Sequence, residues 1–256
     1  MNNAWLPLFA PLTQTPPQHF FTKFRDYIPH SPRRRTPLQG SDYITAISEM
    51  SDSASAMDGW KLAHLALLHP HFWDARAVID RYTETHGVMC DESIRNINSP
   101  CLEKPGLATP RNKRILGVMA MNHRVYMRAN YTSYLSPWQG DWATSDLLGG
   151  RPRREAVEGA FAFAIDRDKA KNASGLAAAF IDVAKFFDSI PRNTAWLLLI
   201  YMGMDRHLIR YMRTIYSHIS RHLKLNGTFG AVVIQSRGFV PGCTFSIIVA
   251  NAVMMV

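Results

Sequence analysis

Residues 175–192 read GLAAAFIDVAKFFDSIPR, and they place an apolar run directly before a pair of aspartates. The run at residues 176–181 has the length and bounded apolar character of a fully buried strand, which would end at Asp182. The following residues predict a helix start, with Asp188 as its N-cap and Pro191 in the first turn, where the missing N–H is tolerated. This stretch therefore predicts a carboxylate at the end of a buried strand.

Because Asp188 is expected to cap a helix, Asp182 would be free for other chemistry. Mg²⁺ takes oxygen ligands in proteins and leaves coordination positions for substrate phosphates. We therefore expect Asp182 to serve in phosphoryl transfer, with partner groups supplied from elsewhere. Taken alone, the same stretch also fits an ordinary strand that runs into a capped helix.

A second stretch, RGFVPGCTFSIIVAN at residues 237–251, removes much of that ambiguity. Its glycines permit close approach of the backbone to another group, and its apolar second half predicts a helix. The two stretches, in this order, resemble motifs A and B of reverse transcriptases, particularly those of non-LTR retrotransposons and group II introns. The matching residues are Asp182, Lys185, Phe187 and Asp188 in the first stretch and Arg237, Gly238, Gly242, Cys243, Ser246 and Asn251 in the second.

The resemblance implies an α/β (α+β) fold, that of a right-hand polymerase with an antiparallel palm sheet packed on helices. Residues 53–174 would form the fingers and residues 175–256 part of the palm. The implied activity is RNA-directed DNA polymerase, a nucleotidyltransferase that extends a DNA primer on an RNA template. Its cofactor would be Mg²⁺, with Mn²⁺ as a substitute, and its substrates would be deoxynucleoside triphosphates.

The resemblance also implies roles for individual residues. Asp182 and the carbonyl of Val183 would hold the metal ion, and Asp188 would be the second acidic residue of the catalytic motif. Phe187 would line the pocket for the incoming sugar. Gly242 would lie beneath the nascent base pair.

Basic residues of the fingers complete the implied nucleotide site. Residues 102–117 form a basic segment punctuated by proline and glycine, which predicts a hairpin, and they resemble the family pattern P-K-x-G…R-P-I. The resemblance implies that Lys104 and one of Arg111, Lys113 and Arg114 contact the triphosphate. Such cations neutralise charge on the transferring group. The sequence does not choose among the last three, because the proline that would fix the register is absent.

A second basic segment, LGGRPRREAV at residues 148–157, resembles the family pattern G-F-R-P-G-R-S. A glycine lets the backbone come close to a ligand, and adjacent arginines suit contacts to phosphate. We expect Arg151, Arg153, Arg154 and Arg237 to bind nucleic acid. A solvated charge cluster at the start of a helix is the alternative interpretation of this segment.

The chain departs from the family pattern in ways that bear on activity. Pro241 stands where the family has glutamine, and Thr244 and Ile247 replace prolines. No Tyr-x-Asp-Asp sequence, the motif C that carries the other metal-binding aspartates, is found in the 256 residues. We therefore expect this chain to be inactive by itself. The alternative is a non-catalytic remnant of a retroelement polymerase that holds nucleic acid by its backbone.

Composition is consistent with an intracellular protein that binds a polyanion. The 256 residues are 47% hydrophobic, enough for a sizeable core, and the formal net charge is +9. The three cysteines form no C-x-x-C pair and leave an odd thiol, which favours a reducing compartment. Because no charged n-region opens the chain and no apolar run reaches about 18 residues, we expect neither a signal peptide nor a membrane span. The nucleus or cytoplasm is the expected location.

The remaining sequence predicts a proline- and arginine-rich arm followed by one domain. Residues 1–40 suit an extended arm, and residues 41–256 the domain. Around Asn226-Gly227, residues 221–225 and 231–236 predict a β-hairpin with a loop that reaches Gly230. Periodicity predicts helices at residues 41–50, 60–68, 72–82, 115–135, 155–166, 196–202 and 205–216 and from residue 245 onward.

Overall fold

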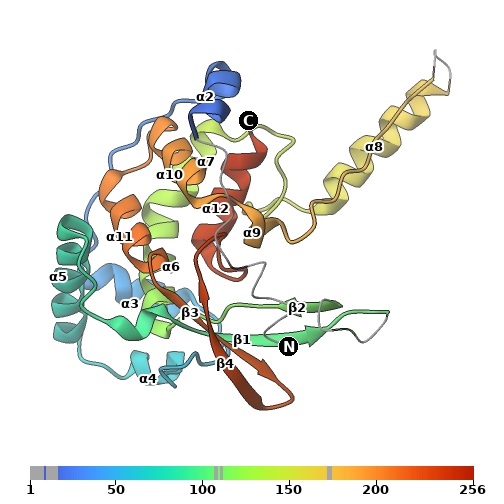
Figure 1. The fold of residues 1–256 in the computed structure, drawn as a ribbon. Coiled ribbons are helices and arrows are strands. Elements are labelled where there is room, and N and C mark those ends of the chain that lie inside the picture. Colours follow the sequence, from blue (N-terminus) through green and yellow to red (C-terminus); the bar gives the residue numbers. More distant parts are fainter. Residues whose placement is uncertain (1–8, 10–16, 107–108, 110–111, 172–174) are drawn as a thin grey trace.

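The computed structural model describes residues 9, 17–106, 109, 112–171 and 175–256. Its helices form a body around one main hydrophobic core, and a four-stranded sheet lies along one side of that body (Figure 1). One helix, α8 (Ala156–Ala170), projects away from the rest. The fold is therefore of the mixed α/β class, as the sequence predicted.

The segment before residue 41 is packed on the body. Helix α2 (Pro17–Phe24) buries Phe21, whose ring stacks on Tyr201 at 4.7 Å, and the 3₁₀ turn η1 (Arg25–Tyr27) follows it. Further on, Arg35 is buried in a two-pronged ion pair with Glu84. A buried guanidinium needs such a partner, and the pair fixes this segment to the body. The expectation of an extended arm is therefore wrong for residues 17–40.

Helices α3 (Gly40–Glu49), α4 (Leu62–Ala66) and α5 (Pro70–His86) confirm three predicted helices. Pro70 begins α5 instead of merely interrupting a helix, because the N–H groups of the first turn have no helical partner in any case. Gly87, with φ of 70°, ends the helix in the left-handed region. Helix α3 packs against α5 and against α6.

The predicted hairpin at residues 102–117 is confirmed. The 3₁₀ turn η2 (Glu92–Arg95) leads into β1 (Asn96–Glu103), which pairs antiparallel with β2 (Lys113–Ile115). Cys101 lies opposite Ile115, and Glu103 lies opposite Lys113. The pairing brings the basic segment to the outer edge of the sheet.

One long helix was expected at residues 115–135, and the structure divides that region. Helix α6 (Met121–Asn130) continues through a turn of π-helix, η4 (Tyr131–Leu135), into α7 (Ser136–Trp142). The helix begins only at Met121, whose backbone N–H donates to the carboxylate of Asp58 at 3.1 Å. A carboxylate at a helix N-terminus satisfies an otherwise unpaired donor.

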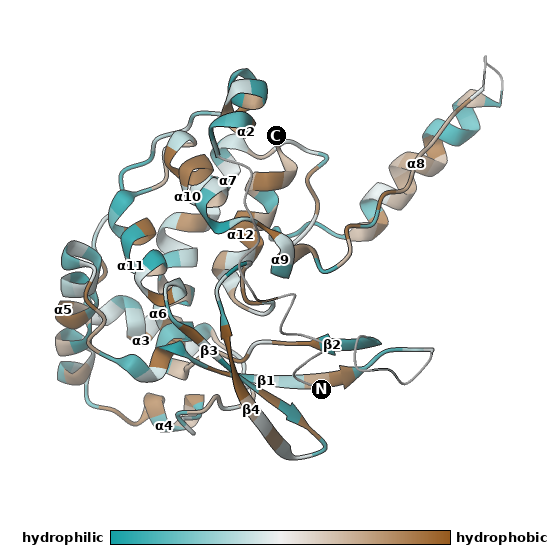
Figure 2. Cartoon of the chain, in the orientation of Figure 1, coloured by the Kyte–Doolittle hydropathy of each residue, from teal (hydrophilic) through white to brown (hydrophobic). Residues whose placement is uncertain are grey.

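The predicted strand at residues 176–181 is not formed. The chain returns alongside α8 as an extended segment, and it pairs with none of the described strands. Phe180 is 84% exposed and Ile181 is 88% exposed, and Figure 2 shows hydrophobic residues along α8 although it stands clear of the body. Apolar composition predicts a buried strand only where a neighbour supplies hydrogen bonds and cover, and here no described segment does.

Helix α9 (Phe186–Ser189) contains Asp188, and α10 (Arg192–Tyr201) starts after Pro191. The expectation that Asp188 caps a helix is therefore wrong. Because proline fixes its own φ and restricts the residue before it, the chain breaks between the two helices. The cap predicted at Asp205 is confirmed, since its Oδ1 accepts from the N–H of Leu208 at 2.9 Å at the start of α11 (Arg206–Tyr216).

Strands β3 (Ile219–Leu225) and β4 (Thr228–Gln235) confirm the predicted hairpin. Its loop is shorter than expected, because Asn226 and Gly227 both adopt positive φ and close a two-residue turn. The sheet order is β2-β1-β3-β4, and β1 runs parallel to β3. The sheet is therefore mixed, which corrects the expected antiparallel sheet. The helices between β1 and β3 provide the long crossover that parallel strands require.

Helix α12 (Thr244–Met254) ends the described chain inside the main core. It packs on α10 and α6. Trp196 contacts both Phe239 and Phe245, with ring centroids 5.2 Å and 5.8 Å away. This aromatic cluster fixes the second motif stretch against the helix that follows the first.

Candidate functional site

The two motif stretches meet in space. The N–H of Phe239 donates to the carbonyl of Phe187 at 2.8 Å. Gly238 has φ of +69°, and a Cβ built there would lie 2.3 Å from the carbonyl oxygen of Asp188. Only glycine combines that conformation with so close an approach. The junction thus depends on residues that belong to both motifs.

Arg192 stabilises this junction through hydrogen bonds to backbone carbonyls. Its guanidinium donates to the carbonyls of Gly238 at 2.7 Å, Gln235 at 3.0 Å and Arg237 at 3.3 Å, and also to that of Tyr216. Burial lowers the pKa of Arg192 to about 10. The sequence interpretation gave this residue no role, although an arginine that opens an otherwise apolar helix is a signal that could have identified it.

Asp188 is buried beside a second arginine that the sequence interpretation also missed. Its side chain faces Arg221 of β3, with Nη1 3.7 Å from Oδ1, and Arg221 is fully buried. Burial raises the pKa of Asp188, while the charges of Arg221, Lys185 and Arg237 oppose that shift. Asp188 therefore contributes to a buried charge cluster and does not face solvent with Asp182. A sequence signal for Arg221 was its alternation in phase with the apolar Ile219 and Leu223, and the structure confirms that this phase is buried.

Arg237 was expected to bind nucleic acid. The structure leaves only 9% of it exposed, and its positive charge acts on Asp188. Its carbonyl accepts from the side chain of Gln235 at 2.9 Å as well as from Arg192. The residue is placed inside the junction, so a contact to a nucleic-acid backbone would require it to become more exposed.

Asp182 and Val183 lie on the exposed connection between α8 and α9. The carboxylate of Asp182 makes no hydrogen bond or ion pair with the described chain. Within the described ranges, no three His, Cys, Asp or Glu side chains are grouped closely enough to hold a metal ion. These residues by themselves do not fit a Mg²⁺ site, which needs more oxygen ligands than one carboxylate and one carbonyl offer.

The residues expected at the triphosphate differ in their exposure and in their ion pairs. Lys113 is buried and its ammonium is paired with Glu103, so its charge is already neutralised. Arg114 is exposed on the opposite face of β2 and makes no ion pair with described residues. Arg111 lies outside the described residues. Arg114 is thus the accessible cation on β2.

Lys104 lies half-buried close to the first motif. Its charge lowers the pKa of Lys185, although burial is the larger cause of that shift. Lys185 adopts the left-handed conformation with φ of 53°, and its Nζ donates to the carbonyl of Lys113 at 3.1 Å. These contacts bring the hairpin of β1 and β2 next to the first motif stretch.

The three arginines of the second basic segment differ in their availability. Arg151 donates to the carbonyl of Thr144 at 2.6 Å and so closes its own turn. Arg154 forms an ion pair with Glu158 at 2.8 Å. Arg153 is exposed, adopts a positive φ of 58° and makes no ion pair with described residues. Arg153 is therefore the cation of this turn that can contact a ligand without losing a partner.

The second motif helix holds this turn in place. The side-chain amide of Asn251 donates to the carbonyl of Gly149 at 2.8 Å. A Cβ on Gly150 would lie 2.3 Å from Cγ2 of Ile247, so the turn and α12 are in close contact. A matched residue of motif B thereby positions the basic segment that precedes α8.

Gly242, expected beneath the nascent base pair, lies where the second motif packs on the chain after β2. It has φ of +104°, and a Cβ there would lie 2.8 Å from the carbonyl oxygen of Gly117. The residue lines a small pocket of about 150 Å³ together with Arg124 and Arg128. Its neighbour Cys243 is buried, with Sγ 3.9 Å from Nε2 of His123.

A search against models of known protein families finds no match for this chain. A search of curated proteins also finds none. No described helix is long and apolar enough to cross a membrane. A functional assignment therefore has to be argued from the residue pattern and from the contacts given above.

Proposed function

We propose that this chain is the fingers and part of the palm of a reverse transcriptase-like domain of retroelement type, whose complete form carries out RNA-templated DNA synthesis. The observation that supports the proposal most is the contact between the two motif stretches. They are far apart in the sequence, yet Phe239 bonds to Phe187 and Gly238 packs on the backbone of Asp188. This contact supports the interpretation that the two patterns belong to one site.

The distribution of unpaired cations also supports the proposal. Arg114 and Arg153 are exposed and carry uncompensated charge, and Lys104 lies close to the first motif. We assign Lys104 and Arg114 to the triphosphate and Arg153 to the template backbone. Phe187 would lie beside the incoming sugar and Gly242 beneath the base pair. Cations at these positions would neutralise the charge of the transferring group and of the nucleic acid.

Asp182 is the proposed ligand for Mg²⁺, together with the carbonyl of Val183. A bound cation would neutralise charge on the triphosphate and would lower the pKa of the primer hydroxyl. Among the described residues, no group of three or more potential metal ligands includes Asp182, so the remaining ligands would have to come from a motif C sequence that these 256 residues do not contain. Asp188 does not fill that role, because it is buried against Arg221.

The second candidate function is a non-catalytic nucleic-acid-binding remnant of such a polymerase. The lack of a group of metal ligands around Asp182 favours this function, since one carboxylate cannot assemble the metal centre that polymerisation requires. Both functions share the basic surface and the contact between the motifs. They differ only in whether the complete protein extends a primer.

The test is primer extension by the product of the complete reading frame, sequenced past the codon for Val256. We expect Mg²⁺-dependent extension of a DNA primer on an RNA template, with loss by orders of magnitude in Asp182→Ala. Asp26→Ala, which removes an exposed carboxylate of η1, serves as the matched control and should leave extension unchanged. Equal activity of Asp182→Ala and wild type would refute the catalytic assignment. Tight duplex binding without any extension would favour the remnant.

A further inference from the structure

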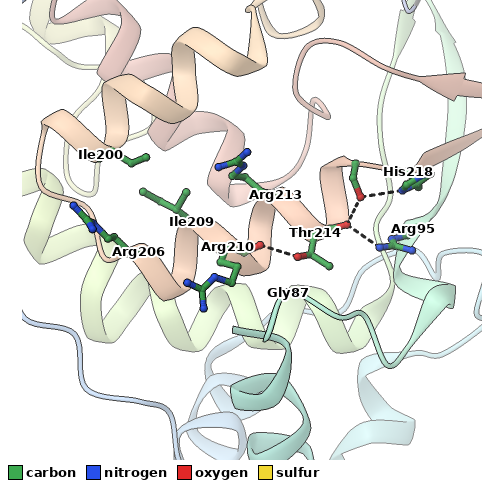
Figure 3. A pocket seen from close by; sticks show the side chains of 10 residues that line it. Gly87, Arg95, Ile200, Arg206, Ile209, Arg210, Arg213, Thr214 and His218 are labelled. Atoms are coloured by element: carbon green, nitrogen blue, oxygen red, sulfur yellow. Dashed lines mark hydrogen bonds between the residues drawn. The ribbon is translucent and has the colours of Figure 1, made fainter. Parts of the chain in front are cut away.

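A basic pocket lies on the outer face of α11, at the end of α5 (Figure 3). It measures about 760 Å³, within the size range of ligand sites in proteins. Four arginines and a histidine are among its lining residues, namely Arg95, Arg206, Arg210, Arg213 and His218. None of the described residues that line it carries a carboxylate.

Three of these arginines form one stripe along α11. Arg206, Arg210 and Arg213 are separated by four and three residues, which places them on one face of an α-helix. The opposite face of α11 is buried in the main core through residues such as Leu208 and Met212. The stripe spans about 10 Å of helix at about 1.5 Å per residue. It is therefore a fixed linear array of cations.

The charge of this array is not neutralised by neighbouring acids. The side chains of Arg206 and Arg213 make no hydrogen bond or ion pair within the described chain. The nearby carboxylates are occupied elsewhere: Glu84 pairs with Arg35, and Asp205 caps α11. Several other arginines of the chain have such partners, as in the ion pairs of Arg76 with Asp80 and of Arg128 with Glu49. The stripe on α11 therefore differs from these paired arginines.

Two arginines of the pocket are held in position before any ligand arrives. Arg95 pairs with Glu92 and donates to the carbonyl of Thr214 at 2.9 Å. Arg210 donates to the carbonyl of Thr85, and its side chain lies 3.5 Å from the position of a Cβ on Gly87. These groups form a rigid cationic wall, while Arg206 and Arg213 keep all their donors for a ligand.

From this arrangement we propose that the α11 pocket binds the phosphodiester backbone of single-stranded nucleic acid. A planar guanidinium matches the geometry of phosphate, and a row of them can contact consecutive phosphates of one strand. Tyr82 and His86 of α5, whose exposed rings stack at 4.2 Å, precede Gly87 in the sequence, and of these three residues only Gly87 lines the pocket. A positively charged groove that follows the backbone is typical of proteins that bind single strands.

This surface is separate from the candidate polymerase site. In Figure 1, α11 and α5 lie on one side of the body, and α9, which follows Asp182, lies on the other with the projecting α8. The inference does not rest on the polymerase proposal. It would hold equally for a catalytic protein and for a non-catalytic remnant, since binding needs no second carboxylate.

The experiment measures binding of a fluorescein-labelled oligouridylate to chain 1–256 by anisotropy at several salt concentrations. The test variant is Arg206→Glu with Arg213→Glu, and the matched control is Lys23→Glu with Arg25→Glu on α2 and η1, which changes the net charge equally. We expect the test variant to bind at least about tenfold more weakly than the control. Its salt slope should fall by about 0.7 for each lost contact, while the control keeps the wild-type slope.

Equal weakening in the test and control variants would overturn the proposal, because it would reduce the effect to net charge. In a competition experiment, polyglutamate and oligothymidylate are each added to displace the bound oligouridylate. Equal displacement by the two competitors would also overturn the proposal, since the pocket would then recognise acidic chains in general. Should the charge-reversed protein unfold, the pair Arg206→Ala and Arg213→Ala, with Lys23→Ala and Arg25→Ala as control, gives the same comparison. The experiment measures binding only, so its result does not depend on whether the protein extends a primer.

Discussion

At Gly238, the absence of a side chain allows the two motif stretches to come together. Its backbone has a positive φ, and the nearest atoms to a built Cβ all belong to the backbone of Asp188. A backbone cannot rotate away as a flexible side chain can. The contact between the motifs therefore has a specific and testable requirement at one position.

Gly238→Ala should destabilise the chain more than Gly59→Ala. Both glycines have φ of +69°, but a Cβ on Gly59 would meet nothing within 4 Å. The left-handed conformation costs an alanine about 1–2 kcal/mol at either position, and overpacking at Gly238 adds about 1–3 kcal/mol. Urea unfolding of the two variants measures the difference. Equal losses would mean that the junction opens at little cost.

His123 should make stability depend on pH. It is 1% exposed, and burial lowers its pKa to about 3, with smaller contributions from Arg76 and Arg124. Between about pH 6.5 and pH 3 the unfolded chain binds a proton that the folded chain excludes. The stabilisation is therefore complete above about pH 6.5 and is lost as the pH falls, by up to about 1.4 kcal/mol per pH unit.

The matching measurement is urea unfolding of wild type and His123→Phe between about pH 5 and pH 8, a range around the ordinary histidine pKa of about 6.5. A phenylalanine keeps the stacking on Tyr211, whose ring lies 6.1 Å away, and removes the titrating group. In the variant, the free energy of unfolding should decrease less steeply as the pH is lowered. An unchanged slope would show that other groups account for the acid sensitivity.

Residues that the sequence did not reveal share one property, which is that their partners are distant along the chain. Arg192 reaches carbonyls of residues 216 to 238, and Arg221 reaches back to Asp188. Local patterns contain no information about such partners. The matched glycines of the second motif were identifiable, because their requirement is imposed by the backbone at their own position.

Among the elements, α8 and the extended chain that follows it depart most from the sequence-based expectation. None of the residues of α8 is buried, and the ring contact of Phe163 with Phe180 at 5.4 Å joins the helix to the returning segment. Helices of this length gain most of their stability from packing an apolar face. The element that carries Asp182 is therefore the least supported part of the described chain.

Hydrogen exchange should be faster in α8 and in residues 175–183 than in α10 and α12. The latter helices pack into the main core, whereas α8 stands in solvent and residues 175–183 make no backbone hydrogen bond with described residues. The free energy of the local opening that exposes an amide to exchange depends on such packing and hydrogen bonding. Exchange measured by mass spectrometry gives the comparison. Protection of α8 equal to that of α12 would contradict this account of the projecting element.

Elements specified by local chemistry were predicted well from the sequence. The cap at Asp205 is formed as expected, and the hairpin at Asn226-Gly227 is formed with a shorter loop than expected, because both depend on residues within a few positions. The parallel pairing of β1 with β3 was not predicted, since it joins strands separated by most of the helical body. The unformed strand at residues 176–181 shows the same limit, because pairing requires a neighbour that the pattern cannot supply.

For the whole molecule, the net charge of +9 is concentrated in part on two separate surfaces. Arg114 and Arg153 are exposed near the residues of the two motif stretches in separate segments, on β2 and before α8, and the other basic surface is the α11 pocket. Buried arginines such as Arg35 and Arg221 contribute to the formal charge but face other protein groups. The charge available to a polyanion is therefore smaller than the composition indicates, and it is placed at defined positions.

Chain 1–256 alone should not extend a DNA primer on an RNA template with Mg²⁺ or Mn²⁺. Phosphoryl transfer by two metal ions needs carboxylates that hold both, and the described residues place only Asp182 on the exposed connection. A displacement of about 1 Å in the reacting groups already costs on the order of a hundredfold in rate. Extension that disappears in Asp182→Ala would contradict this expectation and would mean that another carboxylate completes the site.

The central claim is that the surface formed by the two motif stretches and the hairpin of β1 and β2 binds a primer–template. Fluorescence anisotropy of a labelled RNA template annealed to a DNA primer, titrated with chain 1–256 at increasing salt, tests it most directly. The account predicts affinity that falls by orders of magnitude between about 50 and 200 mM salt, with weaker binding and a smaller slope in Arg114→Glu with Arg153→Glu than in Lys23→Glu with Arg25→Glu. Absence of binding at low salt, or equal effects of the two double variants, would contradict it.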